Sequence, residues 1–217
     1  MKEHTIKIGS GTITLYHGSK GGINGNIKPD SRSLCDFGKG FYMGTDEIQP
    51  LTLICNFPNA KIYKINCDLN DLKILDLDIG LDWALLIAYY RGKMESAHGN
   101  EMYTKYATLA NGCDMIVGYI ANDRMFVVLD RFFAGDITDK ALINSLATLK
   151  LGKQYVALTE KACNQIEIID ERTIGKAEQD KLRKKSEFHR LEGIRKADEI
   201  CREYRRDGLF FDEIVGG

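Results

Sequence analysis

Strand-like and helix-like segments follow one another in this chain in an irregular order, and that order limits the folds open to it. Period-two alternation of apolar residues predicts strands, and a spacing of three and four predicts helices. The predicted strands are 5–8, 12–16, 61–67, 72–77, 115–118, 154–158 and 166–169. The predicted helices are 51–56, 81–90, 102–110, 124–133, 138–149 and 176–206. Because strand–helix–strand units do not alternate strictly, the sequence predicts an α+β fold.

Local signals refine three of these boundaries. Gly9-Ser10-Gly11 separates the first two predicted strands, so we expect a hairpin turn there. Thr45 precedes Asp46 and Glu47 and is predicted to cap a helix, although Pro50 also permits that helix to begin later. Thr138 is predicted to cap the helix that runs to residue 149.

The composition changes near residue 176, where Lys, Arg and Glu become dense. Apolar residues recur there at helical spacing, which predicts an amphipathic helix or a pair of helices with a weak point at Gly193. Segment 209–215 is expected to dock back on the chain or to meet a partner. We therefore expect one domain at 1–175 and a charged helical extension at 176–217.

The overall charge and the cysteine spacing exclude several classes of function. A net charge of −1 gives no global basic field for nucleic acid. The six cysteines include no C-x-x-C pair, which opposes a structural zinc site, and we expect no metal. No apolar run reaches the roughly 18 residues of a membrane span, and the N-terminus does not resemble a signal peptide. We expect a cytoplasmic protein with reduced thiols and leave its oligomeric state open.

Two motifs carry candidate chemistry. The first, LYHGS at 15–19, places His17 at a strand end, where its imidazole can donate or accept a hydrogen bond. The second, DFGKGFYMGTD at 36–46, combines Gly38 and Gly40, which allow close backbone approach, with the ring faces of Phe41 and Tyr42. Neither Gly9-Ser10-Gly11 nor Gly38-Lys39-Gly40 completes the glycine pattern of a Rossmann fold, and the other kinase motifs that should accompany Asp-Phe-Gly are missing.

Together the two motifs resemble those of ADP-ribosyltransferases of the diphtheria-toxin and poly(ADP-ribose) polymerase type. The chain resembles still more closely an uncharacterised bacterial family with that fold, through phrases at 118–126, 154–159 and 206–211. The resemblance covers about residues 13 to 215. It implies a split pair of antiparallel sheets with flanking helices and with NAD, as a substrate, bound between them.

The resemblance also implies roles for individual residues. His17 matches the histidine that contacts the adenosine ribose, and the Gly18 backbone matches the group that holds the nicotinamide amide. Tyr42 matches the ring that stacks on nicotinamide. The remaining expected NAD contacts are Ser19, Gly40, Phe41 and Thr45.

The chain departs from the family pattern at one site residue, because Gln154 stands where those enzymes carry a catalytic Glu. An amide can bind a ribose hydroxyl but can neither act as a general base nor hold negative charge. A different carboxylate is then required; Asp123 is the preferred candidate over Glu160, although Asp123 is equally a helix N-cap. Arg124 is expected to bind the pyrophosphate.

Three functions follow as hypotheses. The first is a mono-ADP-ribosyltransferase that modifies a protein or nucleic-acid target, by resemblance a toxin or an effector in conflict with phage or host. The second is a non-catalytic module that binds NAD or ADP-ribose, which Gln154 favours. The third is an interaction protein that acts through its C-terminal helix.

Overall fold

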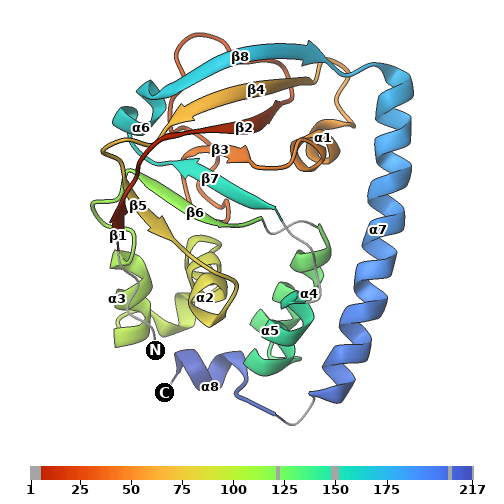
Figure 1. Cartoon of the computed structure of the whole chain (residues 1–217). Helices are drawn as coiled ribbons and strands as arrows, with labels where there is room; N and C mark the ends of the chain where they lie inside the picture. Colours follow the sequence, from red (N-terminus) through yellow and green to blue (C-terminus); the bar gives the residue numbers. More distant parts are fainter. Residues whose placement is uncertain (1–5, 121–122, 148–151, 205–206, 217) are drawn as a thin grey trace.

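The computed structural model describes residues 6–120, 123–147, 152–204 and 207–216, and it has mixed α+β architecture, as predicted (Figure 1). The described strands are β1 Ile6–Ile8, β2 Thr12–Ser19, β3 Phe41–Gly44, β4 Lys61–Asp68, β5 Lys73–Asp76, β6 Met115–Tyr119, β7 Lys153–Ala157 and β8 Ile166–Thr173. The described helices are α1 Ile48–Ile54, α2 Leu81–Tyr90, the 3-10 turn η1 Glu95–Ala97, α3 Glu101–Thr108, α4 Asp123–Phe133, α5 Asp139–Ala147, α6 Glu160–Asn164, α7 Lys176–Glu203 and α8 Phe211–Val215.

The eight strands in the described residues form one open sheet in the order β1-β5-β6-β7-β3-β2-β4-β8. Neighbouring strands run antiparallel except for the parallel pair β5 and β6. The pairing is extensive within β5-β6-β7-β3 and within β2-β4-β8. Between these two halves, β2 and β3 are joined only where Tyr16 lies opposite Gly44.

The predicted hairpin at residues 9–11 is wrong. Strand β1 pairs with β5, at the opposite edge of the sheet from β8, whereas β2 lies between β3 and β4. The connecting residues bond to the turn before β5: the Gly9 amide donates to the Leu72 carbonyl at 2.8 Å, and the Leu69 amide donates to the Gly11 carbonyl at 2.8 Å. A Cβ atom at Gly9 would lie 2.3 Å from the Leu69 carbonyl oxygen, so this crossing requires glycine.

One of the two predicted helix caps is confirmed, and the other is wrong. The Ala141 amide donates to Thr138 Oγ1 at 3.3 Å, which confirms Thr138 as a cap of α5. Helix α1 begins at Ile48, with Pro50 in its first turn, where its missing amide hydrogen costs little. Thr45 does not cap it; its hydroxyl instead accepts from the Lys153 amide at 3.1 Å and ties β3 to β7.

Different segments of the chain pack against the two faces of the sheet. One face buries a cluster that contains Leu15, Phe41, Met43 and Val117, and the loop between β2 and β3 adds Ile23 and Ile27 to it. The other face is covered by helices: α2, α4, α5 and α8 pack around Trp83 over one half, and α1 and α7 pack over the other half (Figure 1). Residues that alternate along β2, β3 and β7 therefore point into different environments.

The C-terminal region is one long helix followed by a short one. Helix α7 continues through Gly193 without a break, places Leu182 in the cluster beneath α1, and buries Cys201 beside α5. Helix α8 docks back on the chain, with Phe211 and Val215 buried in the cluster around Trp83. Residues after 175 thus complete the cores of the preceding segment.

Candidate functional site

A cleft of about 350 Å³ lies where β2 and β3 separate. It is bordered by the loop of residues 20–40, which joins the two strands. The lining residues are His17, Ser19, Gly22, Ile23, Asn24, Asn26, Ile27, Lys28, Asp30, Ser31, Gly40, Phe41 and Tyr42. Both sequence motifs therefore contribute to one cleft, together with the loop that separates them in the chain.

His17 is held in the cleft by three contacts. Its ring stacks on Phe41 with centroids 4.3 Å apart and lies tilted against Tyr63 at 6.3 Å. Its Nδ1 atom is 2.7 Å from the carbonyl oxygen of Tyr42. A carbonyl oxygen only accepts hydrogen bonds, so Nδ1 carries the proton and Nε2 of the neutral ring is an acceptor. Burial lowers the pKa of His17, an effect that the bond to Tyr42 partly opposes, and this favours the neutral ring.

Helix α1 packs closely on β2 next to the point where β2 and β3 diverge. Helix α1 lies against β2 at Gly18, where a Cβ atom would be 3.0 Å from both the Ile54 side chain and the Pro50 carbonyl oxygen. Glycine thus lets α1 sit directly on the strand, beside the point where pairing with β3 stops. Gly18 itself is not among the residues that line the cleft.

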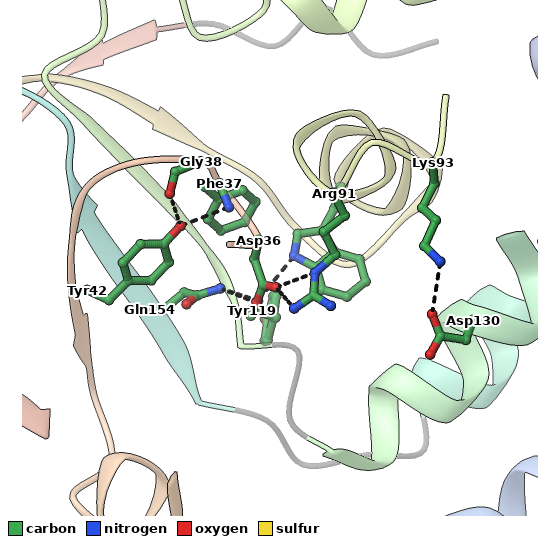
Figure 2. Close-up of polar contacts among 10 residues, drawn as sticks. Asp36, Phe37, Gly38, Tyr42, Arg91, Lys93, Tyr119, Asp130 and Gln154 are labelled. Carbon is green, nitrogen blue, oxygen red and sulfur yellow. Dashed lines mark hydrogen bonds and ion pairs between the residues drawn. The ribbon is translucent and has the colours of Figure 1, made fainter. Parts of the chain in front are cut away.

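Tyr42 is fixed by the segment that precedes β3. Its hydroxyl donates to the Gly38 carbonyl at 2.7 Å and accepts from the Phe37 amide at 3.0 Å (Figure 2). Burial raises the pKa of Tyr42 well above its ordinary value, so the phenol stays protonated. The hydroxyl therefore has a structural role, and its two bonds fix the orientation of the Tyr42 ring.

Gly38 and Gly40 have packing reasons of their own. Gly38 has a φ of +72°, and a Cβ atom there would lie 2.7 Å from the ring of Tyr90. At Gly40 a Cβ atom would lie 2.5 Å from Val156 and 2.9 Å from the Ala157 carbonyl oxygen. The Gly40 amide also donates to Ser31 Oγ at 3.1 Å, which attaches the end of the loop to its middle.

Gln154 is buried in a polar network on the helix-covered face. Its Nε2 atom is 3.3 Å from Asp36 Oδ2 and 3.3 Å from the carbonyl oxygen of Tyr119 (Figure 2). Asp36 also accepts two bonds from Arg91, which follows α2, at 2.7 and 3.0 Å. Arg91 neutralises the buried carboxylate, which would be costly to bury unpaired.

The strand register shows which predicted residues share a face. Gly44 lies opposite Gln154 and Tyr42 opposite Val156, so Tyr42 and Gln154 point to the helix-covered face. His17 lies opposite Tyr63 and points, with Phe41, to the other face. His17, Tyr42 and Gln154 thus stand on three neighbouring strands, on the two sides of the opening between β2 and β3.

The remaining predicted contacts fall into two groups. Ser19, Gly40 and Phe41 line the cleft, whereas Thr45 lies beyond it and bonds to β7. The side chains of Asp123 and Arg124, at the start of α4, lie outside the described residues, so their predicted roles stay predictions.

The polar residues of the loop between the two motifs were not among the predicted site residues. Asn24, Asn26, Lys28, Asp30 and Ser31 all line the cleft. The loop is anchored where the Ile23 amide donates to the Tyr63 hydroxyl at 2.9 Å and where Ser19 Oγ donates to the Gly22 carbonyl at 2.9 Å. The signal was present as polar side chains between glycines, a composition that also fits a solvated loop.

Within the described residues, no group of three His, Cys, Asp or Glu side chains is arranged to hold a metal ion. No helix in those residues has the length and apolar character needed to cross a membrane. All six cysteines are described, and each is a free thiol.

Comparison with known proteins places the chain in a family. The family model described as "Protein of unknown function (DUF3990)" matches residues 13–168, which is most of the chain. The chain belongs to the DUF3990 family. The match spans both motifs, the cleft and Gln154, and it ends within β8, before α7. Neither a curated protein nor a solved structure matches this DUF3990 domain significantly.

Proposed function

We propose that this DUF3990 domain binds NAD in the cleft between β2 and β3 and transfers its ADP-ribosyl group to a macromolecular acceptor. The observation that carries the proposal is the bond between His17 Nδ1 and the Tyr42 carbonyl oxygen. It joins the two motifs and leaves Nε2 of His17 as an acceptor in the cleft. A ribose hydroxyl is a donor that matches this acceptor.

The lining of the cleft fits half of a dinucleotide. Its volume of about 350 Å³ is near the lower end of the range of about 300–1,000 Å³ for small-molecule pockets. Asparagine and serine side chains supply neutral hydrogen-bonding groups for a nucleoside, and the Lys28 ammonium group suits a pyrophosphate. On this proposal the adenosine half lies beside His17, and the nicotinamide half extends towards Tyr42.

The proposed reaction breaks the bond between the nicotinamide nitrogen and ribose C1′. Neutral nicotinamide leaves, the acceptor nucleophile forms a bond to C1′, and the proton of the nucleophile is released to solvent or to a base. Positive charge develops on the ribose as nicotinamide departs, and fixed acceptors close to the ribose would stabilise that charge. His17 and Tyr42 would orient the substrate, while the protonated Tyr42 phenol is unsuited to act as a base.

A second candidate is a module that binds NAD or ADP-ribose without turnover. The observation that favours it is Gln154, whose amide both replaces a carboxylate and is bound to Asp36 and Tyr119. An amide has no proton-accepting role at neutral pH, so the domain would retain the affinity and lose the chemistry.

Two measurements on the full chain separate these functions. Calorimetry with NAD tests binding, and release of labelled nicotinamide, with and without candidate acceptors, tests turnover. We expect His17→Ala to weaken NAD binding by at least about tenfold, since it removes a buried hydrogen-bonding group. The matched control is His98→Ala, because His98 is exposed and lies outside the cleft. Absence of NAD binding at millimolar concentrations contradicts both candidates, whereas saturable binding without nicotinamide release supports the binding module.

A further inference from the structure

The side-chain amide of Gln154 has one orientation that its neighbours can satisfy. Asp36 Oδ2 and the Tyr119 carbonyl oxygen both lie 3.3 Å from the same end of the amide. Both are acceptors, because the ion pair with Arg91 keeps Asp36 ionised and a peptide carbonyl has no proton to give. The amide nitrogen must therefore face them, so Oε1 points away from these two acceptors and no described residue donates to it.

We propose that Asp36 is a positioning residue that fixes Gln154 as a hydrogen-bond acceptor for the nicotinamide ribose of NAD. The inference rests on the proposed function, because it assigns a role within the same site. Gln154 shares a sheet face with Tyr42, which is one of the residues that line the cleft where β2 and β3 separate. In this arrangement Gln154 Oε1 accepts a hydrogen bond from the nicotinamide ribose on one face of the sheet. His17 Nε2 accepts a hydrogen bond from the adenosine ribose on the other face.

Arg91 determines how firmly Asp36 holds this arrangement. Its Nε and Nη2 atoms donate to Oδ1 of Asp36 at 3.0 and 2.7 Å, while Oδ2 receives the Gln154 amide. Charge-assisted bonds of this kind are stronger than a bond from a neutral amide. In an Asp36→Asn variant the remaining oxygen would therefore stay with Arg91, and the new NH₂ group would face Gln154. Gln154 would then either hold its amide nitrogen against the new NH₂ group or turn its oxygen towards residue 36, which places that oxygen against the Tyr119 carbonyl and presents a donor to the ribose.

The same geometry explains why a glutamate at position 154 is incompatible with Asp36. A Gln154→Glu variant would place a carboxylate oxygen about 3.3 Å from Asp36 Oδ2, in the position that the amide nitrogen holds. Two carboxylates at that separation repel, and one of them takes up a proton or moves away. Exchanging the two groups removes the conflict with residue 36 and leaves only the one with the Tyr119 carbonyl: in Asp36→Asn with Gln154→Glu, the asparagine NH₂ donates to one glutamate oxygen, and the other oxygen faces the ribose as an acceptor.

The test is a double-mutant cycle on the full chain that uses NAD affinity as the readout, with the kcat and KM of nicotinamide release added if wild type turns over. We expect each single variant to weaken NAD binding by about tenfold or more, because one donor faces another donor or one acceptor faces another. The double variant should recover part of that loss, because residue 36 again donates to residue 154 while the Tyr119 carbonyl still faces an oxygen. Thermal unfolding of all four proteins shows whether any variant has lost its fold.

The outcomes distinguish this role from the proposed function. If wild type binds no NAD, the proposed function fails and this assignment fails with it. If wild type binds NAD but Asp36→Asn binds equally well, the positioning role alone is wrong. If both single variants are weak and the double variant is no better, Asp36 and Gln154 are not coupled and the role is again wrong. Gln179→Glu is the matched control, since Gln179 is a buried glutamine whose Nε2 donates to the Phe57 carbonyl, outside the cleft.

Discussion

The ring of Phe37 occupies the space that a side chain at Gly118 would fill. A Cβ atom at Gly118 would lie 2.7 Å from Cζ of Phe37 and 3.3 Å from the ring of Trp83. Phe37 is fully buried, and its neighbours in the chain, Asp36 and Gly38, are the residues that contact Gln154 and Tyr42. One glycine on β6 therefore sets how closely the segment before β3 approaches the sheet.

A Gly118→Ala variant should displace this segment. Overpacking a filled core costs typically about 1–3 kcal/mol, so we expect a lower free energy of unfolding in urea together with weaker NAD binding. The control is Gly175→Ala, because a Cβ atom at Gly175 meets no atom within 4 Å. Equal stability of wild type and Gly118→Ala would show that Phe37 moves without cost and that the segment is not fixed by this contact.

Tyr42→Phe tests the role of the Tyr42 hydroxyl separately from that of the ring. The change leaves the Phe37 amide without its partner, and an unsatisfied buried group costs about 1–3 kcal/mol, whereas the Gly38 carbonyl keeps its bond from Ser31 Oγ at 3.3 Å. We expect a lower melting temperature and a smaller loss of NAD affinity than in Tyr42→Ala, which also removes the ring. Tyr103→Phe serves as the control. A variant that melts with wild type would mean that the two hydrogen bonds contribute nothing.

The lowered pKa of His17 predicts how stability depends on pH. The unfolded chain binds a proton at His17 near the ordinary pKa of 6.5, and the folded chain binds it only at lower pH. Stability from the neutral, buried ring is therefore complete above about pH 6.5 and is lost as the pH falls towards the folded pKa. Urea unfolding between pH 5 and 8 should show a shallower acid-side slope for His17→Gln than for wild type. Identical slopes would contradict the burial of a neutral imidazole.

The C-terminal helix α8 should contribute directly to stability. Phe211 is 2 % exposed and packs edge-on against Phe132 and Phe133 of α4, whereas the adjacent Phe210 is 39 % exposed. Phe211→Ala should lower the free energy of unfolding by about 3–5 kcal/mol, the usual cost of truncating a buried phenylalanine. Phe210→Ala should cost much less. If the two variants unfold alike, α8 is not part of the core.

Local sequence patterns predicted most elements but not how they are joined. Strand alternation located β2, β4 and β7, and helical spacing located α2 and α7, because each pattern reflects burial on one side of its own element. The failed hairpin at 9–11 shows the limit: Gly9 is required for contact with Leu69, which lies sixty residues further along the chain (69 − 9). Turn residues indicate that the backbone changes direction, but they do not indicate which segment the chain then contacts.

The candidate site, like the fold, could be predicted only in part from the sequence. The two motifs identified residues on both strands that form the cleft, because aromatic and glycine residues were adjacent in the sequence. The partners of Gln154 were not predictable, since Asp36 and Arg91 come from distant segments and meet only through the packing of α2 on the sheet. The irregular loop between the motifs offered no periodic pattern from which its lining residues could be inferred.

The single pairing of Tyr16 with Gly44 has a mechanical consequence. Because β2 and β3 share only this one paired position, little main-chain hydrogen bonding opposes a change of angle between the two halves of the sheet. The width of the cleft would then be set by the backbone, and its chemical character by the side chains that line it. Selection by size and selection by chemistry would then be encoded in different parts of the sequence, and each could change without the other.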